Sequence, residues 1–290
     1  MATGESLRSL SFSFRISQSY ITRIIQLVLK SLSTHLTPVL LKPPLKEDLV
    51  RIAHDFWHKW NFPNCVGAID GKHICIFSPK KSRSLFFNYK DLFSIVLLAI
   101  VDANCKFLFV DIVSYGKEGD SGIFNKSSIS QIISTGEYFP SPEKLPDSNA
   151  SLLLVHIGDE AFRLDRHMMR VLILGLRQEK IIKRLCSTTD FPGVFYTPIS
   201  LKTETVDNLV LTASCLHNLL RDRYLENTNY YYYNFDDKTP QPSENMMSLA
   251  RTGEYTNFEG FFVRGEFNTF FNSPQGAVPW QNHQSINRLE

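Results

Sequence analysis

The N-terminal part of the chain repeats apolar residues with the period of an α-helix. Ser17 is a favoured N-cap residue, and apolar side chains follow it at helical spacing, which predicts a helix from about residue 18 to residue 36. Pro43 and Pro44 break this pattern. A second apolar stripe predicts an amphipathic helix over residues 46–60. The chain therefore opens with a helical region.

The middle of the chain changes to the shorter apolar runs that are typical of β-strands. Three runs follow one another over residues 66–77, 94–101 and 107–115, and their short connections favour antiparallel neighbours. The apolar spacing then predicts a helix over residues 121–134. Residues 152–157 are nearly all apolar, which suits a strand buried on both faces. The predicted order is three meandering strands, a helix and a buried strand.

The first of these strands carries a carboxylate among apolar residues, in the stretch CVGAIDGKHICIF (65–77). Asp70-Gly71 is a hairpin signal when apolar residues flank it, so a turn is one interpretation. The fourth strand, however, ends at Gly158-Asp159. The element order is that of a ribonuclease H-like nuclease core, in which the first and fourth strands are neighbours. We therefore interpret Asp70 and Asp159 as ligands of one cation.

Composition allows one large domain, or one domain with a smaller annex. The 290 residues are 43% hydrophobic, and the net charge is only +2. The five cysteines form no CxxC pair and are odd in number, which argues against a zinc site or a disulfide framework. The most apolar stretch, residues 93–113, is interrupted by polar residues, so we predict two strands and a turn there and no membrane span.

Positive charge is concentrated locally, next to the first aspartate. Residues 72–90 contain five Lys or Arg and no acid, with aromatic residues between them. Phosphate contacts need positive charge but no special geometry, so this segment is a candidate DNA contact, with a solvated loop as the alternative. For the histidine in it, a structural role is the alternative. The candidate contacts are Lys72, His73, Lys80, Lys81, Arg83 and Lys90.

Several motifs in a fixed order resemble the PIF/Harbinger transposases and the domesticated nucleases derived from them. FPNCVGAIDGKHI (62–74) resembles the first-aspartate motif, and LLLVHIGDEAFRLDRHMMR (152–170) resembles the second-aspartate motif. PISLKTETVDNLVLTASCLHNLLR (198–221) resembles the helix that follows the catalytic core. Further similar segments are FFNYKDLFSIVLLAIVDANCKF (86–107), GKEGDSGIFNKSSI (116–129) and GAVPWQ (276–281).

The resemblance implies an α/β fold, in which helices flank a ribonuclease H-like mixed sheet and a helical annex precedes it. Residues 1–61 are then a helical region, the remnant of a helix-turn-helix part. Residues 62–225 form an incomplete nuclease domain with an acidic Asp-Asp-Glu site. Residues 226–290 form a largely irregular C-terminal tail.

The resemblance also implies a metal-dependent DNA endonuclease. Asp70 and Asp159 match the first two acids of the triad, which hold Mg²⁺ or Mn²⁺ and hydrolyse DNA phosphodiesters in intact relatives. Asp120 matches a further acidic position near the site, with a helix N-cap as the alternative. The resemblance further implies a nuclear protein, with the cytoplasm as the alternative, a separate Myb/SANT-like DNA-binding partner, and no membrane.

The third acid of the triad has no counterpart in this chain. The family carries its glutamate on a helix between the second aspartate and the Pro198-Ile199 motif, and the corresponding interval here lacks that helix. The third catalytic acid is therefore unknown, and we expect cleavage to be impaired. The alternative is a non-catalytic, domesticated DNA- or protein-binding module of the same fold. The poorly matching substitutes are Glu179, Asp190, Glu204 and Asp207.

Overall fold

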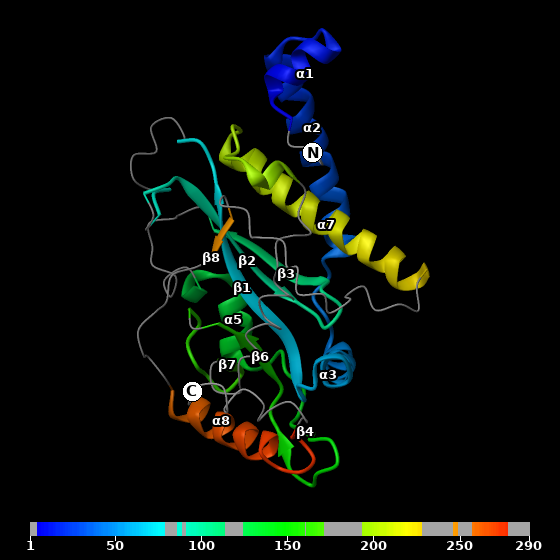
Figure 1. Ribbon diagram of the computed structural model, residues 1–290, viewed down its shortest axis with the longest axis vertical. Helices are drawn as coiled ribbons and strands as arrows, with labels where there is room; N and C mark the ends of the chain where they lie inside the picture. Colours follow the sequence, from blue (N-terminus) through cyan, green and yellow to red (C-terminus); the bar gives the residue numbers. More distant parts are fainter. Residues whose placement is uncertain are drawn as a thin grey trace, which may run out of the picture.

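The computed structural model places helices on both faces of a central β-sheet (Figure 1). The residues that it describes are 5–78, 86–88, 91–113, 124–159, 161–170, 193–227, 246–248 and 257–277. Within these residues, no helix is both long enough and apolar enough to span a bilayer.

Three helices open the chain: α1 (Leu7–Phe14), α2 (Gln18–Leu40) and α3 (Lys46–Trp60). The predicted N-cap of α2 is confirmed, because the Ser17 hydroxyl accepts a hydrogen bond from the Tyr20 amide. The predicted helix, which ended near residue 36, was too short, because α2 continues past Pro38 to Leu40. The Asn218 amide donates to the Leu40 carbonyl, so a residue distant in sequence satisfies the end of the helix.

The central sheet has six strands, and five of them lie in the order β3-β2-β1-β6-β7. β1, β2 and β3 form an antiparallel meander, β6 and β7 run parallel to β1, and β8 pairs antiparallel with the end of β1. The predicted contact between the first and fourth strands is confirmed by the pairing of β1 with β6. The strands are β1 (Cys65–Cys75), β2 (Ser94–Val101), β3 (Phe107–Val113), β6 (Val155–Gly158), β7 (Met168–Arg170) and β8 (Met246–Ser248).

The fourth predicted strand is divided in the structure. Ser151–Leu152 forms β5, which pairs with β4 (Glu143–Lys144) in a separate two-stranded sheet. The Asn64 side chain donates to the carbonyls of Leu152 and Glu143, which fixes this small sheet beside the start of β1. The prediction of one strand over residues 152–157 was therefore wrong at its beginning, and only β6 joins the central sheet.

The helix predicted over residues 121–134 is interrupted at Ser127 in the structure. α5 spans Ser128–Thr135, and the backbone of Ser127 is extended while its hydroxyl accepts a hydrogen bond from the Ser130 amide. Residues 124–126 form a separate helical turn before this cap. Because an N-cap residue must leave helical geometry, Ser127 starts a new helix and does not continue the earlier turn. Residues 114–123 lie outside the described part of the chain.

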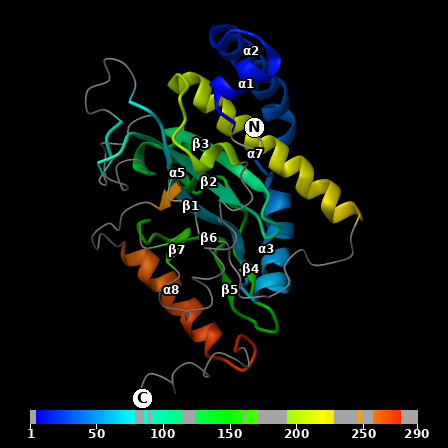
Figure 2. The same cartoon turned by 45° about the horizontal axis from the view of Figure 1, so that its top comes forward.

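Side chains of β1 alternate between two hydrophobic clusters, one on each face of the sheet. Ala68 and Ile74 belong to the first cluster, which also contains residues of α2, α3, α7 (Thr203–Asn227) and α8. Ile69 belongs to the second cluster, which α5 covers. Figure 2 shows α2 and α7 crossing at one end of the molecule, away from α8. The alternation places Asp70 on the face of the first cluster.

The C-terminal tail, predicted to be largely irregular, contains a helix that joins the core. α8 (Phe258–Phe271) packs aromatic side chains on the chain before β1, with the rings of Phe267 and Phe271 lying 5.7 and 5.3 Å from that of Phe62. A short 3₁₀ helix, η3 (Gly193–Tyr196), precedes α7. Apolar burial on this scale gives α8 a defined position despite its poor amphipathic pattern. The predicted domain limits stay a prediction.

Candidate functional site

Asp70 lies in the middle of β1, almost completely covered. Its residue is 8% exposed and sits opposite Ala99 of β2, so it is part of the ladder and not of a turn. Its Oδ1 atom accepts a hydrogen bond of 2.8 Å from the Gly71 amide. A buried carboxylate requires compensation by hydrogen bonds or by an opposite charge. The carboxylate of Asp70 is therefore compensated by this hydrogen bond and by the positive charge of Lys72.

Gly67 allows the strands beside Asp70 to approach closely. A Cβ atom at this position would lie 2.5 Å from Ile100 Cγ2 and 2.9 Å from His156 Nδ1, which no real Cβ contact tolerates. These neighbours belong to β2 and β6, on either side of β1. The glycine of the sequence GAID is thus required for β1 to fit between its two neighbours.

Asp159 follows β6 directly and reaches the same level of the sheet as Asp70. The parallel register pairs Ala68 with Ile157, and each aspartate comes two residues after this pair. Ala68 and Ile157 both belong to the first hydrophobic cluster, so alternation assigns both aspartates to that face. Asp159 Oδ1 accepts a hydrogen bond of 2.9 Å from the Ala161 amide, which orients the carboxylate. A shared cation between the two carboxylates stays a prediction.

Lys72 forms an ion pair with Asp70 inside this site. Its Nζ atom lies 2.8 Å from Asp70 Oδ2, and the two side chains are only 17% and 10% exposed. Residues two apart on a strand share a face, which explains how the lysine reaches the carboxylate. Our sequence analysis assigned Lys72 to DNA contact and missed this pair, although the spacing in Asp-Gly-Lys was a sufficient signal.

The predicted metal site offers two carboxylates to a hard divalent cation. The lysine ammonium already occupies a cation position at Asp70 Oδ2. Mg²⁺ is commonly held by one or two carboxylates together with water, and Asp70 and Asp159 provide two. Within the described residues, no group of three or more His, Cys, Asp or Glu side chains is arranged to hold a metal. Asp120, Glu179 and Asp190 lie outside the described residues.

The remaining predicted DNA contacts divide into one buried residue and a group that the structure does not describe. His73 is 1% exposed, and its Nδ1 atom lies 2.9 Å from Ser94 Oγ. The Asn88 amide donates to the same hydroxyl at 3.1 Å, so a buried polar network joins β1 and β2. Sequence reasoning missed Ser94 and Asn88. Lys80, Lys81, Arg83 and Lys90 lie outside the described residues.

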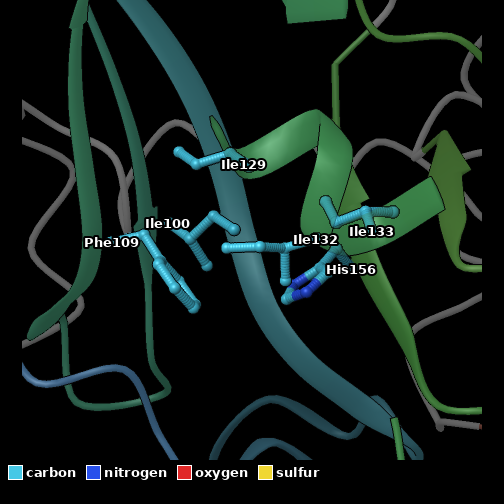
Figure 3. Close-up of a pocket in the computed structure, with 6 residues that line it drawn as sticks. All are labelled: Ile100, Phe109, Ile129, Ile132, Ile133 and His156. Atoms are coloured by element: carbon cyan, nitrogen blue, oxygen red, sulfur yellow. The ribbon is translucent and has the colours of Figure 1, made fainter. Parts of the chain in front are cut away.

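His156 occupies β6 and is completely buried. Among the described residues, neither of its ring nitrogens has a hydrogen-bond partner. Figure 3 shows its imidazole beside a small hollow that is lined by apolar side chains and too narrow for a water molecule. Burial lowers the pKa of His156 to about 3, so its ring is neutral at physiological pH. The lining residues are Ile100, Phe109, Ile129, Ile132 and Ile133.

Two of the substitute acids, Glu204 and Asp207, lie at the start of α7. Burial, and then the neighbouring Glu204 charge, raises the pKa of Asp207 to about 6. Perturbed carboxylates of this kind also occur in structural positions. In the described part of the chain they do not join Asp70 and Asp159 in a metal-binding group.

Part of the sequence that forms this site is similar to a known protein family. Residues 69–184 match the sequence model described as DDE superfamily endonuclease, a segment that includes both Asp70 and Asp159. Over this segment the chain is similar to the DDE superfamily of endonucleases. The predicted resemblance to Harbinger-like, transposase-derived proteins is confirmed, and the mixed sheet with flanking helices is that of a ribonuclease H-like DDE nuclease.

A curated relative supports the same assignment. Protein ALP1-like from Arabidopsis thaliana is 29% identical over 167 residues, which are 57% of this chain. The aligned residues cover 40% of that relative, well under two thirds of its length. No solved structure matches the chain significantly.

Proposed function

We propose that this transposase-derived protein binds DNA and one divalent cation, Mg²⁺ or Mn²⁺, through Asp70 and Asp159. When bound, such an ion activates water and stabilises the charge that develops on a phosphodiester. Asp70 and Asp159 hold the ion, and the hydrogen bonds from the Gly71 and Ala161 amides orient their carboxylates. The observation that carries the proposal is the parallel register of β1 and β6, which brings both aspartates to one level of the sheet.

Cleavage by this chain is weak or absent under the proposal. Two-metal hydrolysis needs carboxylates around both ions, and the helix that supplies the third acid in the family has no counterpart in the sequence. Two aspartates suffice for one ion, with water completing its coordination. Under this proposal the chain binds DNA as a nuclease-like protein but does not hydrolyse it efficiently.

The proposed DNA contact is the basic segment that follows Asp70, including Lys80, Lys81, Arg83 and Lys90. Binding through these side chains is sequence-independent and weakens steeply as salt increases, since it depends on counterion release. A nuclear location and a separate Myb/SANT-like partner belong to the same proposal and rest on the family resemblance.

The experiment measures Mn²⁺ binding and plasmid nicking by the full chain. We expect Mn²⁺ to bind the wild type, Asp70→Asn to weaken that binding at least about tenfold, and nicking to stay at background. Lys106→Met is a matched control, because Lys106 forms its ion pair with Asp222 of α7, at 2.6 Å. Mn²⁺ binding that is insensitive to Asp70→Asn contradicts the metal site. Robust plasmid nicking by the wild type that Asp70→Ala abolishes contradicts the proposal that cleavage is weak or absent.

A non-catalytic protein-binding module is the second candidate, and the N-terminal helices favour it. Figure 1 shows α1 and the first half of α2 extending beyond the sheet. Several large apolar side chains there are exposed, including Phe12 at 73% and Leu27 at 61%. Such residues are common at protein interfaces. This candidate predicts that replacing Asp70 leaves the cellular binding partners unchanged, whereas Phe12→Ser with Leu27→Ser removes them.

A further inference from the structure

Lys72 is chemically unusual in its surroundings, because it places an ammonium group within the predicted metal site. Its Nζ atom lies 2.8 Å from Asp70 Oδ2, and 17% of its side chain is exposed. The other oxygen of Asp70 accepts the Gly71 amide. The lysine therefore pairs with the carboxylate oxygen that does not accept the Gly71 amide, which is the oxygen that a metal would need.

A lysine and a divalent cation compete for such an oxygen. Mg²⁺ requires carboxylate oxygens at about 2.0–2.1 Å, and an ammonium group hydrogen-bonded to the same oxygen then lies within a few ångströms of the ion. Two cations at that distance repel each other strongly in a site with little water. The flexible four-carbon stem of lysine allows its ammonium group to move away.

We propose that Lys72 is an internal counter-ion of Asp70 that a divalent cation displaces. In the metal-free protein, Lys72 neutralises the buried carboxylate and keeps the site folded. When the ion binds, the ammonium group leaves Asp70 and becomes available to a phosphate of the DNA, which lysine binds as a point charge. This inference rests on the proposed function, since it requires the ion to bind at Asp70. Lys72 is a positioning residue in this account.

The first test compares Mn²⁺ affinity in the full-length wild type, Lys72→Met and Lys106→Met by titration calorimetry. Lys72→Met removes the competing charge and keeps the apolar stem, so we expect Mn²⁺ to bind roughly five- to tenfold tighter. Lys106→Met also breaks a lysine–aspartate pair, but the Asp222 partner lies in α7 and the affinity stays at the wild-type value. Unchanged or weaker Mn²⁺ binding by Lys72→Met overturns the inference.

The second test does not need a metal. Thermal unfolding of wild type, Lys72→Met, Asp70→Asn and the double variant forms a double-mutant cycle. Removal of Lys72 alone leaves a buried carboxylate without its cation and lowers the unfolding midpoint, whereas adding Asp70→Asn restores it. Additive midpoints overturn the counter-ion role. This cycle is independent of metal binding and DNA cleavage, so it separates failure of the inference from failure of the proposed function.

A third measurement uses the unmodified protein and remains decisive if Lys72→Met does not fold. Acylation of lysines is followed by mass spectrometry with and without Mn²⁺. Displacement from Asp70 exposes the Lys72 amine, so we expect its modification rate to rise severalfold, while Lys106 keeps its rate. Equal rates for Lys72 at saturating Mn²⁺ overturn the inference. Absence of Mn²⁺ binding to the wild type contradicts the proposed metal site itself.

Discussion

The contact between β1 and β6 and the turn between β2 and β3 both bury ionisable side chains, but they stabilise them differently. At the turn, Asp102 is 9% exposed and its Oδ1 atom accepts hydrogen bonds from the Asn104 and Lys106 amides at 2.8 and 2.9 Å. At the strand contact, Asp70 is 8% exposed, accepts one amide hydrogen bond from Gly71 and forms an ion pair with Lys72. The two aspartates are therefore buried to nearly the same extent, but different groups compensate their negative charges.

The difference separates a structural carboxylate from a candidate functional one. Asp102 satisfies backbone groups that the turn leaves without partners, so its carboxylate is needed to close the turn. Asp70 sits within a regular ladder whose backbone is paired with β2, and its carboxylate accepts the amide of the next residue, Gly71, and closes no turn. A buried carboxylate that pairs with a partly buried ammonium group is a stronger sign of chemistry than burial itself.

The largest expected effect comes from His156 at acid pH. Because burial lowers its pKa from about 6.5 to about 3, the unfolded chain takes up this proton before the folded one does. Folding stability is therefore lost as the pH falls below about 6.5, by up to about 1.4 kcal/mol per pH unit. We expect His156→Leu to remove this part of the pH dependence, as measured by urea unfolding between pH 7 and pH 4.

His35→Leu serves as the control for that series, because His35 is exposed on α2. We expect it to retain the pH dependence of the wild type. Parallel stability curves for wild type and His156→Leu would show that the buried imidazole is already compensated.

The next effect concerns the turn. Asp102→Ala leaves the Asn104 and Lys106 amides without their acceptor, at a cost of about 2–3 kcal/mol in the free energy of unfolding. Asp102→Asn retains an acceptor oxygen, so we expect a change below about 1 kcal/mol at pH 7. Urea unfolding of both variants measures the difference. Equal losses of unfolding free energy in Asp102→Ala and Asp102→Asn would show that the negative charge of Asp102, and not its hydrogen bonds, stabilises the turn.

The smallest effect tests the close packing at Gly67. An added methyl group meets Ile100 and His156, so we expect Gly67→Ala to destabilise the fold by about 1–2 kcal/mol. Gly265→Ala is the matched control, since nothing lies within 4 Å of its added Cβ and α8 gains helix propensity. Thermal unfolding measures both changes. A neutral Gly67→Ala would mean that β1 and β2 can separate slightly without loss.

Local patterns predicted much of the fold because they depend only on residues that are close in sequence. The helix over residues 46–60 and the strand over residues 94–101 have the predicted limits. Apolar periodicity sets which side of an element is buried wherever it packs. The placement of Asp70 on a strand, and of Asp159 directly after one, followed from the same reasoning.

The predicted ends of helices and strands were wrong where a contact with a residue distant in sequence determines them. α2 continues to Leu40 because the Asn218 side chain donates a hydrogen bond to the carbonyl of that residue. β5 is separated from β6, and the Asn64 side chain donates hydrogen bonds to the carbonyls of Leu152 in β5 and Glu143 in β4. No local pattern contains those contacts, which join residues 178 and 88 positions apart. The same limit applies to α8, whose weak amphipathic pattern gave no signal of the aromatic packing around Phe62.

By itself, the sequence determined the acidic residues, the order of the elements and the resemblance to the DDE superfamily, since motifs and periodicity are properties of the chain. Only the tertiary structure decided the parallel register of β1 and β6, which places Asp70 and Asp159 at one level of the sheet, and the ion pair between Lys72 and Asp70. The physical reason is desolvation. The same ammonium group is a solvated charge on an open surface and a counter-ion once packing removes water from the carboxylate beside it.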